Sequence, residues 1–191
     1  MKDLFKTMFG LTLCLFFVNF SPATSAAGEE NDDKMPVMTT VGHVDLVKYA
    51  GVWYEYARIP NSFQNDCLQN TTATYRLRED GKIQVTNRCI DADADTIVAN
   101  GIAQVVDTAT PSKLEVSFVR ILGFNLFWGD YWIIGLAEDY RYAIVGEPSR
   151  KYGWILSRTP ALSEEDYDFV KKILTEQGYD PADFILSKNV Y

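Results

Sequence analysis

The sequence has few of the residues that build metal sites and nucleic-acid-binding surfaces. Its 191 residues include one histidine and three cysteines, too few for most metal sites made from those side chains. Lysine and arginine number 18 against 26 aspartate and glutamate, the formal net charge is −8, and no basic run occurs. Because a phosphate backbone is bound mainly by clustered cations, the composition excludes nucleic acid as a partner. We expect no metal and no cofactor.

Long hydrophobic runs are also scarce, and the clearest one lies near the N-terminus. Lys2 and Lys6 lie in a short basic start, which is followed by a 13-residue apolar run, 8–20, and by small residues over 21–27. A basic start, a short apolar centre and a small-residue end are typical of a secretory signal peptide. Since about 20 apolar residues are needed to cross a bilayer, we predict a signal peptide over 1–26, cut near Ala26. The alternative is a short uncleaved anchor.

A lipoprotein signal is a further alternative, because Cys14 lies within the apolar run. Such a signal normally has a small residue before the cysteine, whereas Leu13 precedes Cys14 here, and the run continues beyond it. We therefore expect Cys14 to be removed with 1–26, which takes away a net charge of +1 and changes −8 to −9. Residues 27–40 then form a flexible acidic leader. An exported protein, periplasmic or associated with the outer membrane of a bacterium, is the prediction.

Two cysteines remain after this cleavage, Cys67 and Cys89. An even count in an exported chain first indicates a disulfide. The alternative is a free catalytic thiol, but such a thiol needs a base. The one histidine, His43, precedes the first predicted strand.

The remaining chain is rich in apolar residues, at 47% of the sequence, and reads as eight strands and one helix. Apolar and polar residues alternate along 72–78 and 82–89, and Asp80-Gly81 between them predicts a hairpin turn. The other predicted strands are 52–59, 97–106, 113–119, 129–137, 140–146 and 152–158. Short strands separated by regular turns indicate an all-β sandwich or an up-and-down barrel.

A helical period replaces this alternation after residue 160. Ser163 is a suitable N-cap, acidic residues fill the first turn, and Gly178 can end the helix. Its single apolar stripe must pack against something. The strands 131–137 and 140–146 are apolar on both faces, as expected if the helix covers their outer side.

Connectivity assigns the two ends of a barrel. In a simple meander, residues 51–53 and Arg158 lie at one end, the base, so Trp53 and Arg158 become neighbours when the sheet closes. Cys67 and Cys89 both lie at the other end, the mouth, which permits a disulfide between them.

Three short segments resemble the signatures of the lipocalin family, in the same order. They are Gly51-Val-Trp53-Tyr-Glu55, Glu138-Asp139-Tyr140-Arg-Tyr142 and Ile155-Leu-Ser-Arg158-Thr-Pro160. The resemblance covers about 42–191, is strongest to the bacterial lipocalins and the apolipoprotein D group, and indicates a lipocalin domain over 41–191. Glu138 departs from it, since the family often has threonine there.

The resemblance implies an eight-stranded antiparallel up-and-down β-barrel with a C-terminal α-helix packed on its outside and a ligand cup. It also implies that the Arg158 guanidinium lies over the Trp53 indole and closes the base, a cation–π contact of about 0.5–2 kcal/mol.

Inward positions follow from the alternation along each strand. We predict that the cup is lined by Ala73, Tyr75, Val85, Asn87, Val116, Phe118, Tyr131, Trp132 and Trp154. Tyr131 and Trp132 are placed near the mouth, although a strand apolar on both faces leaves its inward face open. Ala99, Gly101 and Ala103 form a small-residue face that leaves room. The alternative is that these side chains simply fill a core.

The segment 120–130 is unusually apolar for a connection at the mouth, with Phe124, Phe127 and Trp128 prominent. An exposed apolar patch generally marks a partner, ligand or membrane contact. We expect it to touch lipid or a second subunit, as in a homodimer. The alternative is a loop folded over the barrel.

The predicted function is non-catalytic binding, transport or storage of small hydrophobic ligands. Each buried CH₂ contributes about 0.8 kcal/mol, and no charged cluster converges on the inward faces. Arg58, Arg88 and Arg120 lie toward the mouth and could meet an acidic head group. Fatty acids or lysophospholipids as guests are implied by the resemblance. The alternatives are a lipocalin-fold enzyme acting on a lipophilic substrate and a binder of retinoid-like or haem-like pigments.

Overall fold

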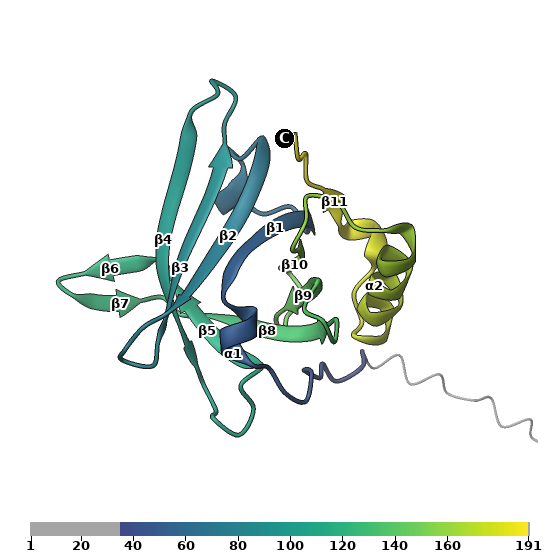
Figure 1. The fold of residues 1–191 in the computed structure, drawn as a ribbon, viewed down its shortest axis with the longest axis horizontal. Helices are drawn as coiled ribbons and strands as arrows, with labels where there is room; N and C mark the ends of the chain where they lie inside the picture. The colour runs from purple at the N-terminus through teal and green to yellow at the C-terminus, as the bar shows by residue number, and fades with distance from the viewer. Residues whose placement is uncertain (1–34, 191) are drawn as a thin grey trace, which may run out of the picture. The chain divides into compact units, whose positions relative to one another are not determined.

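The computed structural model describes residues 35–190, and the predicted signal peptide, Ala26 and Cys14 lie outside them. Eight antiparallel strands follow one another around a barrel, and the last pairs with the first (Figure 1). They are β1 (Gly51–Arg58), β2 (Gln69–Leu77), β3 (Ile83–Ile90), β4 (Thr96–Val105), β5 (Lys113–Ser117), β8 (Gly129–Leu136), β9 (Tyr142–Gly146) and β10 (Gly153–Ser157). The predicted up-and-down barrel is confirmed, and the sandwich alternative is wrong.

The alternation of the sequence explains why these segments are strands. In β3, Ile83, Val85 and Cys89 are buried on the inner face, while the residues between them are more exposed. Side chains of a strand point alternately to its two faces, so one row enters the barrel and the other meets solvent. Gly81, with φ of +77°, makes the turn from β2 to β3 in a conformation that favours glycine.

The predicted helix is α2 (Glu164–Glu176), and it packs on the outside of the barrel as expected. The Ser163 hydroxyl caps it by accepting a 3.1 Å hydrogen bond from the Asp166 amide. Val170 and Leu174 are fully buried against the outer side chains of β8, β9 and β10. The molecule therefore has two cores, one inside the barrel and one between the barrel and α2.

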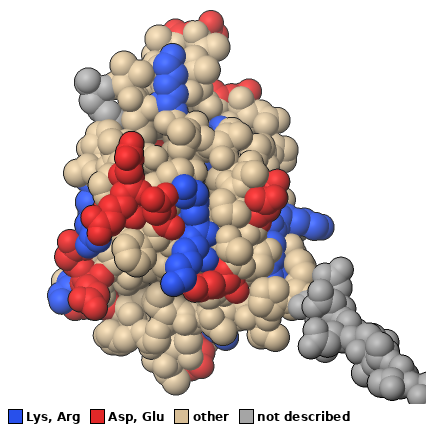
Figure 2. All heavy atoms as spheres, turned by 90° about the vertical axis from the view of Figure 1, so that its right-hand side faces the viewer, with Lys and Arg blue, Asp and Glu red and all other residues tan. Residues whose placement is uncertain are grey.

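The surface on the α2 side mixes acidic and basic side chains (Figure 2). An ion pair between Arg141 and Asp166, at 2.6 Å, ties the β8–β9 turn region to the start of α2. No helix in the part of the chain that the structure describes combines the length and apolar composition needed to span a membrane.

Several short elements were not predicted. They are α1 (Leu46–Tyr49), the 3₁₀ turns η1 (Ser62–Gln64) and η2 (Pro181–Asp183), the strand β11 (Ile185–Leu186) beside β1, and a hairpin of β6 (Val119–Ile121) and β7 (Phe124–Leu126). Two to four residues are too few to show a helical or strand period.

The N-terminal boundary also differs from the prediction. Met38 is buried, and Thr39 exchanges two hydrogen bonds with Gln177 at the end of α2. The Ser112 hydroxyl bonds to the Thr40 side chain. The last residues of the predicted 27–40 leader are therefore part of the folded domain, because they cover its second core.

Candidate ligand-binding site

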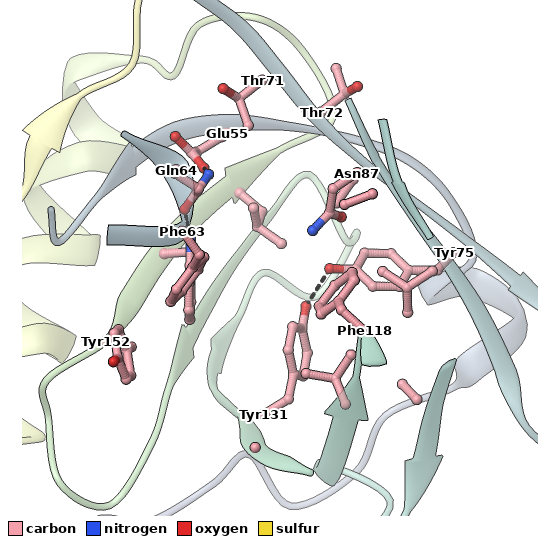
Figure 3. Close-up of a pocket in the computed structure, with 18 of the residues that line it drawn as sticks. Glu55, Phe63, Gln64, Thr71, Thr72, Tyr75, Asn87, Phe118, Tyr131 and Tyr152 are labelled. Carbon is pink, nitrogen blue, oxygen red and sulfur yellow. Dashed lines mark hydrogen bonds between the residues drawn. The ribbon is translucent and has the colours of Figure 1, made fainter. Parts of the chain in front are cut away.

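The barrel encloses a cavity of about 470 Å³ that is open to solvent. Its wall is predominantly apolar and is built from the inward rows of the strands (Figure 3). Eight of the nine residues predicted to line the cup do line it: Ala73, Tyr75, Val85, Asn87, Val116, Phe118, Tyr131 and Trp154. The space is therefore not filled by the protein's own side chains.

The base of the barrel is closed as predicted. Trp53 is fully buried, and the Arg158 guanidinium lies 3.8 Å from the centroid of its ring. Nη2 of Arg158 donates to the carbonyls of Lys48, Tyr49 and Ala50 at 2.6–3.1 Å, and Nη1 donates to that of Val52 at 2.8 Å. One side chain thus satisfies the carbonyls that α1 leaves open at its end.

Three tyrosines meet directly above this closure. The Tyr131 hydroxyl from β8 lies 2.8 Å from the Tyr49 hydroxyl at the end of α1 and 2.8 Å from the Tyr75 hydroxyl of β2. We call Tyr49, Tyr75 and Tyr131 the tyrosine cluster; all three line the cavity. Burial raises the pKa of Tyr75 to about 12 and that of the other two well above the usual 10.

Two predicted positions need correction. Tyr131 lies near the base instead of the mouth, and Trp132 does not line the cavity. Trp132 points outward, where it packs against the core under α2 and the Lys113 ammonium lies 4.5 Å from its ring centroid. The reason is that the chain leaves the barrel wall after Ser117 and returns to it nearer the base. Tyr131 of β8 therefore pairs with Leu114, near the start of β5.

Aromatic and polar side chains gather around the other end of the cavity. Phe63 of η1 contacts the rings of Tyr152 and Trp154, with centroids 5.4 and 6.2 Å apart. Gln64 accepts from the Trp154 indole N–H at 3.0 Å and donates to the buried Glu55 carboxylate at 2.8 Å. Phe63 and Gln64 were missed because η1 is only three residues long and shows no recognisable period.

The disulfide between Cys67 and Cys89 is confirmed, with Cα atoms 5.4 Å apart. It joins the loop that follows η1 to the end of β3. Both cysteines line the cavity, so the bridge fixes one side of its opening.

The arginines predicted near the mouth have different surroundings. Arg58 is largely buried and pairs with Glu55 at 2.7 Å, so its charge is already neutralised. Arg88 is exposed and touches the cavity wall. Arg120 lies on β6, on the outer side of the barrel.

The apolar segment 120–130 forms the β6–β7 hairpin, which projects away from the barrel instead of folding over it (Figure 1). Leu122 at its tip is 92% exposed, and Phe124 and Phe127 are 71% and 79% exposed. Trp128 differs from the prediction, because it is half-buried with the Lys82 ammonium 5.9 Å from its ring centroid.

Phe118 and Gly101 together explain how the wall ends at this hairpin. A β-carbon at Gly101 would lie 2.7 Å from the Phe118 ring and 2.8 Å from the Ser117 carbonyl. Only glycine therefore lets Phe118 lie against β4. The small residues of β4 were expected to leave room inside the barrel. At Gly101 this room is occupied by the Phe118 ring, whereas Ala99 and Ala103 line the cavity.

Comparison with known proteins agrees with this architecture. The model of the lipocalin-like domain matches residues 44–189. The outer membrane lipoprotein Blc of Escherichia coli is 38% identical over 149 residues, which cover 78% of this chain and 81% of that protein. Apolipoprotein D of Macaca fascicularis is also 38% identical over 149 residues, covering 71% of this chain and 72% of that protein.

A solved structure gives the same result for the fold. The cockroach allergen Per a 4 superposes with a TM-score of 0.63 at 25% identity, covering 84% of this chain and 98% of that one. A closed barrel, an outer C-terminal helix, the Trp53–Arg158 closure and these similarities agree: the chain belongs to the lipocalin family.

Proposed function

We propose that this protein binds and carries fatty acids or lysophospholipids without catalysing a reaction. The observation that supports it is the open, apolar cavity of about 470 Å³. Ligand cavities commonly measure about 300–1,000 Å³ and are lined mostly by apolar side chains. An acyl chain buried there gains about 0.8 kcal/mol for each CH₂, and lipocalins are generally binding proteins that do not catalyse reactions.

The test is to identify what the cavity holds and then to block it. Protein purified without detergent is analysed by native mass spectrometry, and its bound lipid is extracted under denaturing conditions. Ala73→Trp fills the cavity from β2 and should abolish binding of a fluorescent fatty acid. Arg76→Trp is the matched control, because Arg76 lies on the same strand but is exposed. Equal binding by both variants, each shown to be folded by thermal denaturation, would contradict the proposal.

Two alternative functions, catalysis by a free thiol and haem binding through histidine, are not supported by the residues that they would need. Cys67 and Cys89 form a disulfide, so neither is a free thiol for catalysis; a thiol titration of the exported protein should detect neither. His43 is exposed and does not line the cavity, which removes it as a haem ligand. An absorbance spectrum of the purified protein should show no pigment band.

The same proposal extends to location. The similarity to an outer membrane lipoprotein and the disulfide support a site in an oxidising cell envelope. Fractionation of cells that express the full chain, followed by mass determination of the mature protein, tests both the location and cleavage near Ala26. A mature protein that retains an acylated Cys14 would contradict the predicted cleavage.

We propose further that the β6–β7 hairpin contacts a lipid bilayer when ligand is exchanged. Leu122, Phe124 and Phe127 are exposed on a projecting element whose root borders the cavity, since Phe118 and Val119 line it. The net charge of −9 predicted for the mature chain, after residues 1–26 with their net charge of +1 are removed from −8, would repel an anionic surface. The contact is therefore apolar and is expected with zwitterionic lipid.

Sedimentation with phosphatidylcholine vesicles tests this contact. Phe124→Ser with Phe127→Ser should reduce the bound fraction, while the control Phe169→Ser removes a phenylalanine that is 54% exposed on α2. If the double variant binds vesicles normally but changes from dimer to monomer in sedimentation velocity, the hairpin is an interface between two copies. No change in either measurement would exclude both roles.

A further inference from the structure

The tyrosine cluster has one more hydroxyl proton than its internal hydrogen bonds use. Three phenol groups carry three protons, and the two contacts of 2.8 Å between them use two. No other hydrogen-bond partner for these hydroxyls occurs among residues 35–190. Whichever way the two bonds run, one O–H remains as a donor within the cavity.

This proton is present at physiological pH. Burial raises the pKa of all three hydroxyls, that of Tyr75 to about 12, so the cluster stays neutral. The cluster is also held in place. Tyr49 and Tyr75 are only 4% and 7% exposed, their rings lie 5.5 Å apart, and Tyr49 packs on Trp53 at 5.0 Å.

Asn87 adds a second neutral polar group on the same wall. Its Oδ1 is buried and has no hydrogen-bond partner in the described part of the chain. Figure 3 shows its amide directed toward the same space as the Tyr75 and Tyr131 hydroxyls. Asn87 lies two residues along β3 from Val85, which pairs with Tyr75, so the two polar positions are about 7 Å apart along the strand.

No charged side chain that the structure describes at the cavity wall is free to pair with a guest at the depth of the tyrosine cluster. Glu55, Arg88 and Asp130 are the charged residues of the described chain that touch the cavity wall. Glu55 is already bonded to Arg58, Gln64 and Ser187, and the other two are exposed. Arg158 lies beneath the cluster, but its Nη atoms donate to backbone carbonyls. An anionic group at the floor would therefore lose its water without a direct ion pair, because the Nη atoms of Arg158 are already bonded to four carbonyls.

We infer that the tyrosine cluster, with Asn87, is a subsite for a neutral oxygen-bearing group, a hydroxyl or carbonyl, at the deep end of the guest. This inference rests on the proposed lipid-binding function and specifies the chemistry of the buried end. An unsubstituted chain end leaves the spare O–H without a partner, whereas an oxygen atom there accepts its hydrogen bond. An acidic head group of the same guest stays at the opening, near Arg88.

Two probes of equal length test it: hexadecanoic acid and 16-hydroxyhexadecanoic acid, measured by calorimetry. Both carry the same carboxylate, so they differ only at the end that enters first. A hydroxyl buried without a partner weakens binding by about tenfold or more. In the unmodified protein we expect the two dissociation constants to agree within about threefold, because the cluster compensates for the lost water.

The triple variant Tyr49→Phe, Tyr75→Phe and Tyr131→Phe removes all three protons and keeps the rings. It should bind the hydroxylated probe about tenfold more weakly than the plain one. Tyr167→Phe, a matched change on α2 outside the cavity, should keep the unmodified ratio. If the triple variant does not fold, the ratio in the unmodified protein still decides.

The outcomes separate the subsite from the function. A ratio that disfavours the hydroxylated probe by tenfold or more in the unmodified protein would overturn the subsite. An equal ratio in the unmodified protein and the triple variant would do so as well. In both cases lipid binding itself stands. Failure of both probes to bind would overturn the subsite and, with it, fatty acids as the ligands of the proposed function.

Discussion

The two ends of this barrel are built in opposite ways. At the base, Trp53 is fully buried, and the Arg158 guanidinium is surrounded by an aromatic ring and four backbone carbonyls. At the mouth, Phe63 and Tyr152 are exposed, and order depends on a disulfide and on one glutamine. The base is thus held by buried contacts, whereas the mouth is bordered by exposed rings, and the mouth is the end at which a guest can enter.

The largest effect should come from Arg158→Ala. The change removes the cation–π contact and leaves four carbonyls without a charged donor, so we expect a loss of about 4 kcal/mol in the free energy of unfolding. Ligand affinity should change much less, because Arg158 does not line the cavity. Thermal denaturation and a fatty-acid titration measure the two quantities. With the exposed Arg76→Ala as control, a larger loss of affinity than of stability would reverse the comparison.

Removing the disulfide tests the mouth. Cys67→Ser with Cys89→Ser opens a loop with a sequence separation of 22 residues, for which chain entropy predicts a loss of about 3 kcal/mol. Unlike Arg158→Ala, this change should also weaken ligand binding, since Phe63 and Gln64 are no longer held at the opening. Chemical denaturation and lipid titration of the double variant check both effects. Unchanged affinity would show that the bridge only stabilises the fold.

Alkaline pH should loosen the base selectively. Burial raises the pKa of Tyr75 to about 12, against about 10 in the unfolded chain. The contribution of Tyr75 is therefore fully present below pH 10 and is lost as the pH rises toward 12, up to about 3 kcal/mol. Urea denaturation at pH 8 to 11.5 measures the slope, and Tyr75→Phe should make it less steep, with Tyr49 and Tyr131 causing the remainder. An identical slope in that variant would assign the loss to other groups.

Gln64→Ala should have the smallest effect. It leaves the Trp154 indole N–H without its acceptor and removes one donor to Glu55, which costs about 1 kcal/mol. Because Trp154 lines the cavity, affinity should fall about fivefold, which corresponds to the same 1 kcal/mol. Trp154 fluorescence during lipid titration reports the change. If Gln64→Ala lowered the free energy of unfolding as much as Arg158→Ala does, the mouth and the base would contribute equally to stability.

Alternation along the strands was sufficient to predict most of the barrel and most of the cavity wall. It worked for β2 and β3, where one face meets solvent. It failed for β8, because Ile133 and Ile134 are both buried, one toward each core. No local pattern indicated the inward face of that strand, and Trp132 was placed inside when it packs under α2.

The tyrosine cluster could not be predicted, because its members come from α1, β2 and β8. Only the closed register of the barrel brings their hydroxyls together. The exit of the chain at Phe118 was also missed, since the sequence stays apolar across the point where β5 ends and β6 begins. That exit depends on a contact with Gly101 on another strand.

The Glu55 carboxylate has a consequence for how the mouth moves. It accepts from Gln64 of η1, from Arg58 of its own strand and from the Ser187 hydroxyl near the C-terminus, and its backbone carbonyl accepts from Asn189. Both η1 and the final residues of the chain are thus attached to Glu55. We therefore expect that displacement of η1 weakens the attachment of the final residues, and a fluorescent label near Ser187 should report it.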